Sequence, residues 1–150
     1  MNRKDREIED LKKIEEILLK SRVLRLALCN NNHPYVVPMN FGYKENHIYI
    51  HSSKKGMKID LLKKNNNVAF EVDFDHELVI ADKACGFSMK YESVIGFGKA
   101  FFVEDQKEKK EAFDIIMSHY SKDNFDYEME EIENVCIIRI DIDSMTGKKS

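Results

Sequence analysis

Apolar side chains recur at helical spacing in separate stretches of the chain, and these stretches predict helices. Residues 4–20 place apolar positions among charged ones, which predicts an amphipathic helix. Those apolar positions are Ile8, Leu11, Ile14 and Leu18. A shorter helix is expected over Lys54–Lys64, ended by the Asn65–Asn67 run. Another helix is expected to begin at Asp105, whose side chain can cap it, with Glu108 three residues further on. Its apolar stripe consists of Phe113, Ile116, Met117 and Tyr120.

Shorter apolar runs bounded by turn-forming residues predict strands. The runs cover residues 23–29, 35–41, 47–51, 68–74, 91–103 and 135–142. Turn clusters at Asn30–Pro34 and Lys44–Asn46 join the first three runs, which predicts an antiparallel meander. Gly96 and Gly98 indicate bulges or points of close approach in the fifth run. Residues 76–90 carry no clear pattern, and we expect a loop with a short strand around residues 78–80.

Strands joined with few β-α-β crossovers favour a mainly β fold, an antiparallel barrel with flanking helices. The 150 residues contain no internal repeat, linker or low-complexity tract, so we expect one domain over residues 1–150. The formal net charge of −3 argues against a general nucleic-acid binder, whose surface would be basic. The acidic residues 121–134 are typical of a solvated surface.

Charge density and cysteine usage indicate the compartment. Residues 1–20 are dense in charge and lack the apolar core of a signal peptide. No apolar run is long enough to span a bilayer. Cys29, Cys85 and Cys136 are widely spaced and odd in number, which is typical of buried thiols rather than a disulfide framework. We therefore expect a cytoplasmic protein that does not associate with membranes.

The segment His51–Lys58 is a candidate anion site, because a predicted strand ends and a predicted helix begins there. A helix N-terminus presents unbonded backbone N–H groups and the positive end of the helix dipole, which suit a phosphate. Two serines and three lysines in the segment would add donors and positive charge. The alternative is a solvated turn in which a serine caps the helix, since short Ser/Lys turns are common.

The run Tyr35–Phe41 is apolar on both faces and is interrupted by Pro38. Proline cannot donate to a strand ladder, so Pro38 marks an edge or a bulge. A broken ladder would leave backbone groups free for the hydrogen-bonding edge of a ligand such as a flavin pyrimidine ring, and Asn40 could add its amide. The alternative is an ordinary barrel strand with an edge proline.

Histidines at strand spacing give no clear metal site. His47 and His51 stand four residues apart and share a face with Tyr49 between them. On a strand they lie too far apart for one zinc without a bulge, and no acidic or cysteine partner stands at a metal-binding spacing, so no metal is expected. The other histidines are expected on the surface or in loops, and they are His33, His76 and His119.

Several short runs stand in a recognisable order along nearly the whole chain. They are Val23–Ala27, Pro34–Phe41, Ile48–Ser52, Phe70–Asp73, Ser93–Ala100 and Met145–Lys148. In this order they resemble the pyridoxamine 5′-phosphate oxidase-like FMN-binding split barrels. Within that superfamily the chain is most similar to the branch of nitroimidazole-resistance and related flavin-nucleotide-binding proteins. Glu92 is acidic where that branch tends to be basic, and the residues that bind pyridoxal phosphate in the true oxidase have no clear counterpart, so a vitamin B6 oxidase is not expected.

The resemblance implies a six-stranded split barrel that forms a homodimer with two FMN sites at the subunit interface. The residues implied to hold the FMN phosphate are His51, Ser52, Ser53, Lys54, Lys55 and Lys58. The backbone implied to line the isoalloxazine ring is that of Val37, Pro38, Met39 and Asn40. Ser93 matches the position where the oxidase uses a glutamine near the ring, and His51 matches a histidine beside the ligand in the nitroimidazole-resistance branch.

The function implied is that of a small FMN-dependent oxidoreductase of the nitroimidazole-reductase type. It would take electrons from a reduced donor and pass them to a small-molecule substrate, and His51 would be the catalytic residue that delivers a proton. One alternative is a non-enzymatic flavin carrier or stress protein. Another is a haem-binding protein on the same fold, with His51, His47 or His119 as axial ligand.

Overall fold

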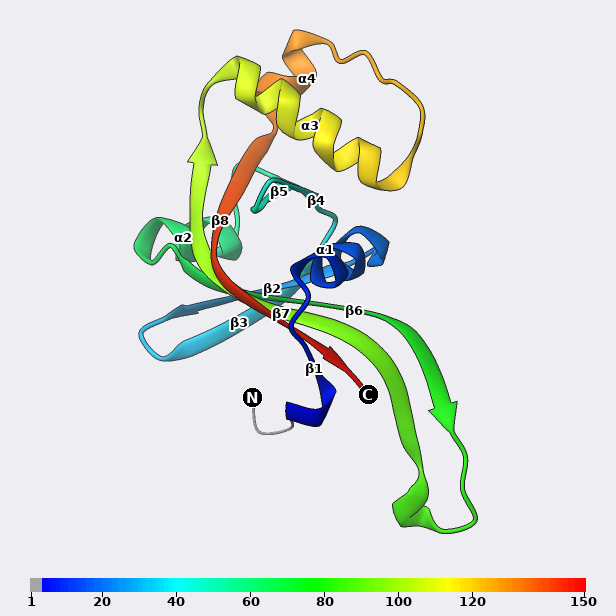
Figure 1. The fold of residues 1–150 in the computed structure, drawn as a ribbon. Coiled ribbons are helices and arrows are strands. Elements are labelled where there is room, and N and C mark those ends of the chain that lie inside the picture. Colours follow the sequence, from blue (N-terminus) through cyan, green and yellow to red (C-terminus); the bar gives the residue numbers. More distant parts are fainter. Residues whose placement is uncertain (1–3) are drawn as a thin grey trace.

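The computed structural model describes residues 4–150, and these residues form a strongly curved antiparallel sheet with helices packed around it (Figure 1). Its helices are η1 (Lys4–Arg6), α1 (Leu11–Lys20), α2 (Met57–Lys64), η2 (Ala84–Gly86), α3 (Gln106–Tyr120) and α4 (Met129–Asn134). Its strands are β1 (Glu7–Ile8), β2 (Leu24–Asn30), β3 (His33–Met39), β4 (Gly42–Lys44), β5 (His47–Ser52), β6 (Asn67–Val79), β7 (Ser88–Val103) and β8 (Cys136–Lys149). The strand order is β3-β2-β6-β7-β8-β5-β4, and β1 pairs with β8. This confirms the mainly β architecture, a split barrel with flanking helices, with eight strands where six were expected.

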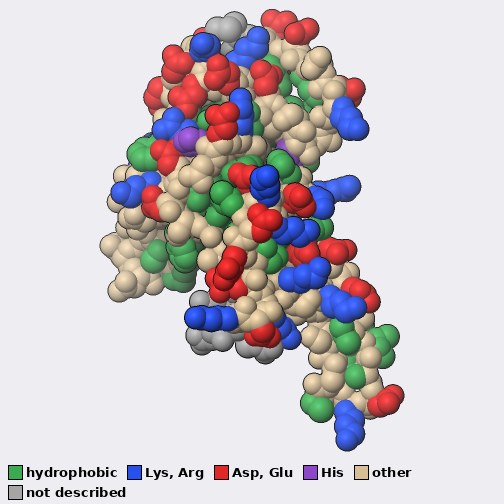
Figure 2. Space-filling view, viewed as in Figure 1, with side chains coloured by type: hydrophobic (Ala, Val, Ile, Leu, Met, Phe, Trp, Pro, Cys, Tyr) green, Lys and Arg blue, Asp and Glu red, His purple; other side chains and the backbone are tan. Residues whose placement is uncertain are grey.

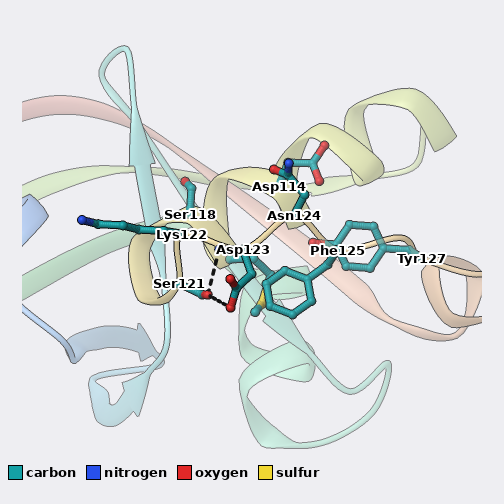
Figure 3. A pocket seen from close by; sticks show the side chains of 9 residues that line it. Asp114, Ser118, Ser121, Lys122, Asp123, Asn124, Phe125 and Tyr127 are labelled. Carbon is teal, nitrogen blue, oxygen red and sulfur yellow. Dashed lines mark hydrogen bonds between the residues drawn. The ribbon is translucent and has the colours of Figure 1, made fainter.

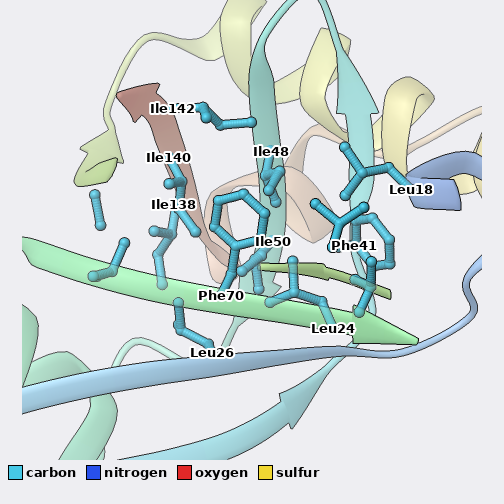
Figure 4. Packing of buried hydrophobic residues seen from close by; sticks show 14 of the residues in the cluster. Leu18, Leu24, Leu26, Phe41, Ile48, Ile50, Phe70, Ile138, Ile140 and Ile142 are labelled. Carbon is cyan, nitrogen blue, oxygen red and sulfur yellow. The ribbon is translucent and has the colours of Figure 1, made fainter. Parts of the chain in front are cut away.

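The barrel core is built from the inward-facing residues of the strands. Leu24 and Leu26 of β2, Phe70 of β6 and Ile138 and Ile140 of β8 alternate with outward-facing residues, as strand geometry requires. Figure 4 shows these side chains converging with those of β5 and α1. Gly96 leaves room for the Phe70 ring, because a Cβ atom there would overlap it. The pairing of β7 with β8 shifts register between Phe97 and Gly98, so the predicted close approach and bulge are both confirmed.

Two tight turns set the register of the first hairpins. Asn31 and Asn32 have φ of 49° and 60°, and Glu45 and Asn46 have φ of 49° and 67°. Two successive residues with positive φ are the geometry that matches the right-handed twist of a two-residue hairpin. The two turns and their hairpins, β2–β3 and β4–β5, are therefore confirmed, but the predicted meander of three neighbouring strands is wrong, because β3 and β5 lie near opposite ends of the sheet order. Pro34, expected in the turn, lies in β3.

The N-terminal helix is shorter than its periodicity predicts. The Asp10 side chain accepts a hydrogen bond from the Lys12 backbone N–H, so the helix begins at Leu11. Ile8 belongs to β1, where it pairs with Gly147 of β8, and not to the helical stripe. Helical spacing alone could not distinguish an Ile8 in the helix from an Ile8 in a strand before it, because an apolar residue fits either position.

The expected loop over residues 76–90 is largely a hairpin. Strands β6 and β7 continue past the barrel, with Leu78 paired to Met89, and they project from the molecule (Figure 1). Side chains of this arm remain exposed, so the alternation that signals a half-buried strand is missing there. Within residues 121–134 the structure adds the short helix α4, held by reciprocal capping between Glu128 and Glu131.

Charge is distributed unevenly over the molecule. Figure 2 shows acidic side chains gathered over the end formed by α3 and α4, and apolar side chains on the projecting hairpin. None of the helices in residues 4–150 is long and apolar enough to cross a membrane.

Candidate functional site

The turn between β5 and α2 leaves the start of α2 without a side-chain cap. Gly56 occupies the N-cap position with φ 123°, a backbone conformation that favours glycine, and it makes no side-chain cap hydrogen bond. Ser53 does not cap the helix, because its hydroxyl donates to the Lys55 carbonyl at 2.7 Å. The serine-capped turn is therefore wrong, and so is the expected start of the helix at Lys54. The first N–H groups of α2 have no acceptor within the helix, as at any helix N-terminus.

Lys58 connects this turn to the end of β3. Its ammonium donates to the Met39 sulfur at 3.1 Å, so the two segments expected to hold opposite ends of a flavin lie side by side. A thioether is a weak acceptor. Burial lowers the pKa of Lys58, which is half-buried and has no carboxylate partner in residues 4–150. Lys54 and Lys55 are exposed and also form no ion pair in this part of the chain.

Strand β3 lies at one end of the sheet order, which confirms that Pro38 marks an edge. Val37 and Met39 face the core and are half-buried, whereas Pro38 and Asn40 are exposed. One long edge of this strand is therefore unpaired within residues 4–150, and its backbone groups are open to a ligand.

His51 lies on the outer face of β5, beside helix α3. Its ring stacks on that of Phe113 with centroids 6.5 Å apart and planes at 26°. Phe113 in turn contacts the Tyr127 ring at 5.3 Å. His47 and Tyr49 have ring centroids 6.3 Å apart on the same face, which confirms the shared face but gives no metal cluster within residues 4–150. Phe113 was expected only as a core residue, and the sequence carries no signal that would place it under His51.

His119 corrects the expectation that it lies on the surface or in a loop. It is half-buried on α3, where one ring nitrogen lies 2.6 Å from the Ser21 carbonyl oxygen. Its other ring nitrogen, Nδ1, is buried without a hydrogen-bond partner in the described chain, and the ring packs on Phe41 at 4.5 Å. Such a ring joins α3 to the barrel and is poorly placed to ligate an iron.

Ser93 lies apart from Lys54, Lys55 and Lys58. Pairing places Met39, Leu24, Val72 and Val94 in one row across four neighbouring strands. At the usual strand separation this row spans roughly 14 Å along the sheet. Ser93 is therefore not brought to the Lys58 region within one chain, although it and Pro38 share the outer face of the sheet.

A charged network occupies that outer face between Ser93 and Pro38. Arg25 donates to Glu71 at 3.0 Å and to Asp73 at 2.6 Å, and His76 lies 3.0 Å from Asp73. Burial alone would raise the pKa of Asp73, but hydrogen bonds from Arg25 and His76 outweigh it and hold that pKa below its usual range. The sequence did not mark Arg25 as a site residue, and only its outward position on a predicted strand could have done so.

A cavity with a volume of about 600 Å³ lies elsewhere, between α3 and the segment that follows it, as Figure 3 shows. Ser121 and Asp123 bond to each other at its edge, with Ser121 Oγ donating to Asp123 Oδ2 at 2.9 Å. None of the site residues expected from the sequence lines this cavity.

Comparison with protein-family models matches residues 10–149 to the family described as pyridoxamine 5′-phosphate oxidase. The chain belongs to the pyridoxamine 5′-phosphate oxidase-like family. A search of curated proteins found no match.

One similar solved structure is that of a protein of Bacteroides thetaiotaomicron provisionally named a 5-nitroimidazole antibiotic resistance protein. The two chains are 42% identical, with a TM-score of 0.86 over 95% of this chain and 86% of the other. The flavocytochrome Anf3 of Azotobacter vinelandii is 22% identical, with a TM-score of 0.84 over 96% and 69% of the two chains. A FAD- and haem-binding protein of Mycobacterium smegmatis is 18% identical, with a TM-score of 0.87 over 97% and 73%. The last two likenesses establish the fold alone.

Proposed function

We propose that this protein binds FMN and acts as a small flavin-dependent oxidoreductase of the nitroimidazole-reductase type. The observation that carries the proposal is the Lys58–Met39 contact, which joins an uncapped, lysine-rich helix start to the open end of an edge strand. A phosphate suits the first feature and a planar hydrogen-bonding ring suits the second.

The names of related proteins support the same class of ligand. The 42% identical relative is provisionally named for resistance to 5-nitroimidazoles. More distant structures with the same fold are named a flavocytochrome and a FAD- and haem-binding protein. A flavin is a ligand that the last two names share, and it suits the geometry described above.

The residues of the chain would act on a bound flavin as follows. Lys54, Lys55 and Lys58 would hold the phosphate, and the backbone from Val37 to Asn40 would orient the ring. The flavin, when bound, supplies the redox chemistry between a reduced donor and a small acceptor. His51 would hold or deliver a proton at its imidazole, and Phe113 lies against one face of that ring.

A homodimer with cofactor sites at the subunit interface is part of the proposal. Strand β7 exposes Ile95, Phe97 and Phe101 on its outer face, and these side chains are 47%, 56% and 40% accessible. An apolar surface of this kind is typical of a protein interface. Phe97→Lys should convert a dimer to a monomer in light scattering. A wild-type chain that is monomeric at all concentrations would contradict this part.

The cytoplasm remains the proposed location. Cys29, Cys85 and Cys136 are free thiols, which suit a reducing compartment, although Cys29 and Cys85 are exposed and not buried as expected.

The test of cofactor binding uses absorbance and salt. We expect the purified protein to retain the paired visible bands of a flavin after addition of FMN and desalting. Lys55→Ala with Lys58→Ala should weaken FMN binding at least tenfold and flatten its salt dependence, since charge-assisted hydrogen bonds are lost. The matched control is Lys44→Ala with Lys64→Ala, which removes two exposed lysines outside the site. Equal FMN affinity in the test and control variants would refute the proposal that Lys55 and Lys58 hold the FMN phosphate.

Turnover distinguishes the enzyme from a flavin carrier. The FMN-loaded protein should oxidise a reduced donor repeatedly in the presence of a nitroaromatic acceptor, and a carrier would stop after one equivalent. Haem is the second candidate, favoured by the names of two structural neighbours. An intense Soret band in place of the flavin bands would support it, with exposed His51 as the first ligand to replace.

A further inference from the structure

A basic cavity, separate from the one that follows α3, lies where α2, the end of β7, the start of α3 and the start of β8 meet. Its volume is about 330 Å³. Three lysines line it: Lys54, Lys63 of α2 and Lys109 of α3, against the carboxylate of Glu104. Its remaining walls are apolar, with Ile59 and Val103 almost fully buried. Positive charge therefore predominates in a recess with rigid apolar walls.

Lys109 is the residue that sets this cavity apart from an ordinary lysine-rich surface. It is only 9% accessible, yet it has neither an ion pair nor a hydrogen bond to any side chain in residues 4–150. The stem of a lysine commonly packs against apolar groups while its ammonium reaches solvent. None of Lys54, Lys63 and Lys109 forms an ion pair within residues 4–150, so three unpaired positive charges line one recess, and the recess has the composition of a site completed by a bound anion.

The charges of three lysines act on one side chain, the Cys136 thiol. Burial raises the pKa of the Cys136 thiol, and the charges of Lys109, Lys58 and Lys54 oppose that rise. Lys54 thus belongs both to this cavity and to the turn proposed to hold the flavin phosphate. Lys63 and Lys109 belong to the cavity alone.

We propose that this cavity binds a phosphate group that is distinct from the FMN phosphate. Its volume is at the lower end of small-molecule sites, which suits a phosphate with a small organic group against the apolar walls. The phosphate could come from a dinucleotide flavin that continues past Lys54, a case that rests on the proposed function. It could equally come from a separate phosphorylated molecule.

The test is a titration of inorganic phosphate into the full chain saturated with FMN, followed by calorimetry at low ionic strength. Lys63→Met and Lys109→Met remove charge while keeping an apolar stem of similar length. Each should weaken phosphate binding at least tenfold. The controls Lys64→Met and Lys110→Met change the neighbouring exposed lysines on the same two helices and should stay within twofold of the wild type. Thermal unfolding checks that each variant is folded, and Lys63→Met keeps the test valid if Lys109→Met is not.

Each outcome of this experiment decides a separate point. Equal phosphate affinity in Lys63→Met and Lys64→Met, or no binding at millimolar phosphate, overturns the proposal. If FAD binds at least tenfold more tightly than FMN and Lys63→Met abolishes the difference, the phosphate is that of a dinucleotide. If FAD and FMN bind equally while phosphate binds, the source is a separate molecule. If the chain does not hold FMN, the proposed function fails, and the same titration on the FMN-free chain still tests the cavity.

Discussion

Replacing Gly96 by alanine should destabilise the barrel through a single contact. Gly96 of β7 pairs with Phe70 of β6, and a Cβ atom on it would overlap three atoms of the Phe70 ring. Phe70 is 1% accessible and lies at the centre of the core, so its ring has no free space to enter. The substitution therefore tests whether the sheet is held together by the packing described here.

The expected cost follows from the tightness of this contact. Overpacking of a filled core usually costs about 1–3 kcal/mol, and the rigid surroundings of Phe70 place Gly96→Ala near the upper end, at about 3 kcal/mol. For a chain of this length each kcal/mol lowers the Tm by about 2–4 °C. We therefore expect a fall of about 6–12 °C.

Thermal unfolding at one fixed protein concentration measures the shift, because association would make the Tm depend on concentration. The companion variant Phe70→Leu removes the ring atoms that the new Cβ would meet. In that background Gly96→Ala should cost much less, which is a non-additive result typical of residues in contact. A Tm for Gly96→Ala within 1 °C of the wild type, or strictly additive costs in the double variant, would refute the reasoning.

Three further predictions concern the helix starts and one buried acid. In Gly56→Ala the added Cβ atom would have no neighbour within 4 Å, so any cost must come from the φ of 123°, which favours glycine. Chemical denaturation should show a loss of stability of about 1–3 kcal/mol, and FMN affinity should fall as well. Asp105→Ala removes the acceptor of the Glu108 N–H at 2.9 Å and should cost about 1 kcal/mol. Burial would raise the pKa of Glu92, but Lys149 at 3.0 Å and Lys13 at 3.7 Å outweigh it and lower that pKa. Its stabilisation is thus present above the ordinary carboxyl pKa and lost as the pH falls through the lowered value, so Glu92→Gln should flatten the loss of stability in acid.

Elements with a local signal could be predicted from the sequence. The Asp105 cap, the Asn65 helix end and the Asn31–Asn32 turn each specify their own geometry, and all three are found in the structure. The two-residue strand β1 could not be predicted, because it exists only by pairing with β8 at the other end of the chain. Strand β4 is similarly short and depends on β5.

The candidate site was predictable only in part, for a comparable reason. The charge of the turn around Lys55 and the break at Pro38 are visible in the sequence. The contact between Lys58 and Met39 is not, because it depends on how α2 packs against the sheet. Lys109 gave no signal at all: it stands in a charged helical run next to Lys110, and only the fold shows that one is buried and the other exposed.

The absence of carboxylate partners for Lys58 and Lys109 within residues 4–150 is a property of their positions and not of a shortage of acids. The chain has 27 acidic residues against 24 basic ones. Elsewhere the fold neutralises its buried or bridging charges: Arg139 bonds Glu108 and Asp141, each at 2.7 Å. On α3, Glu108 lies one residue from Lys109 but is engaged by that arginine. At the α2–α3 junction three lysines face the carboxylate of Glu104 and none of the three forms an ion pair within residues 4–150. The excess positive charge there is left for groups from outside the chain, and phosphates would neutralise there what carboxylates neutralise in the rest of the fold.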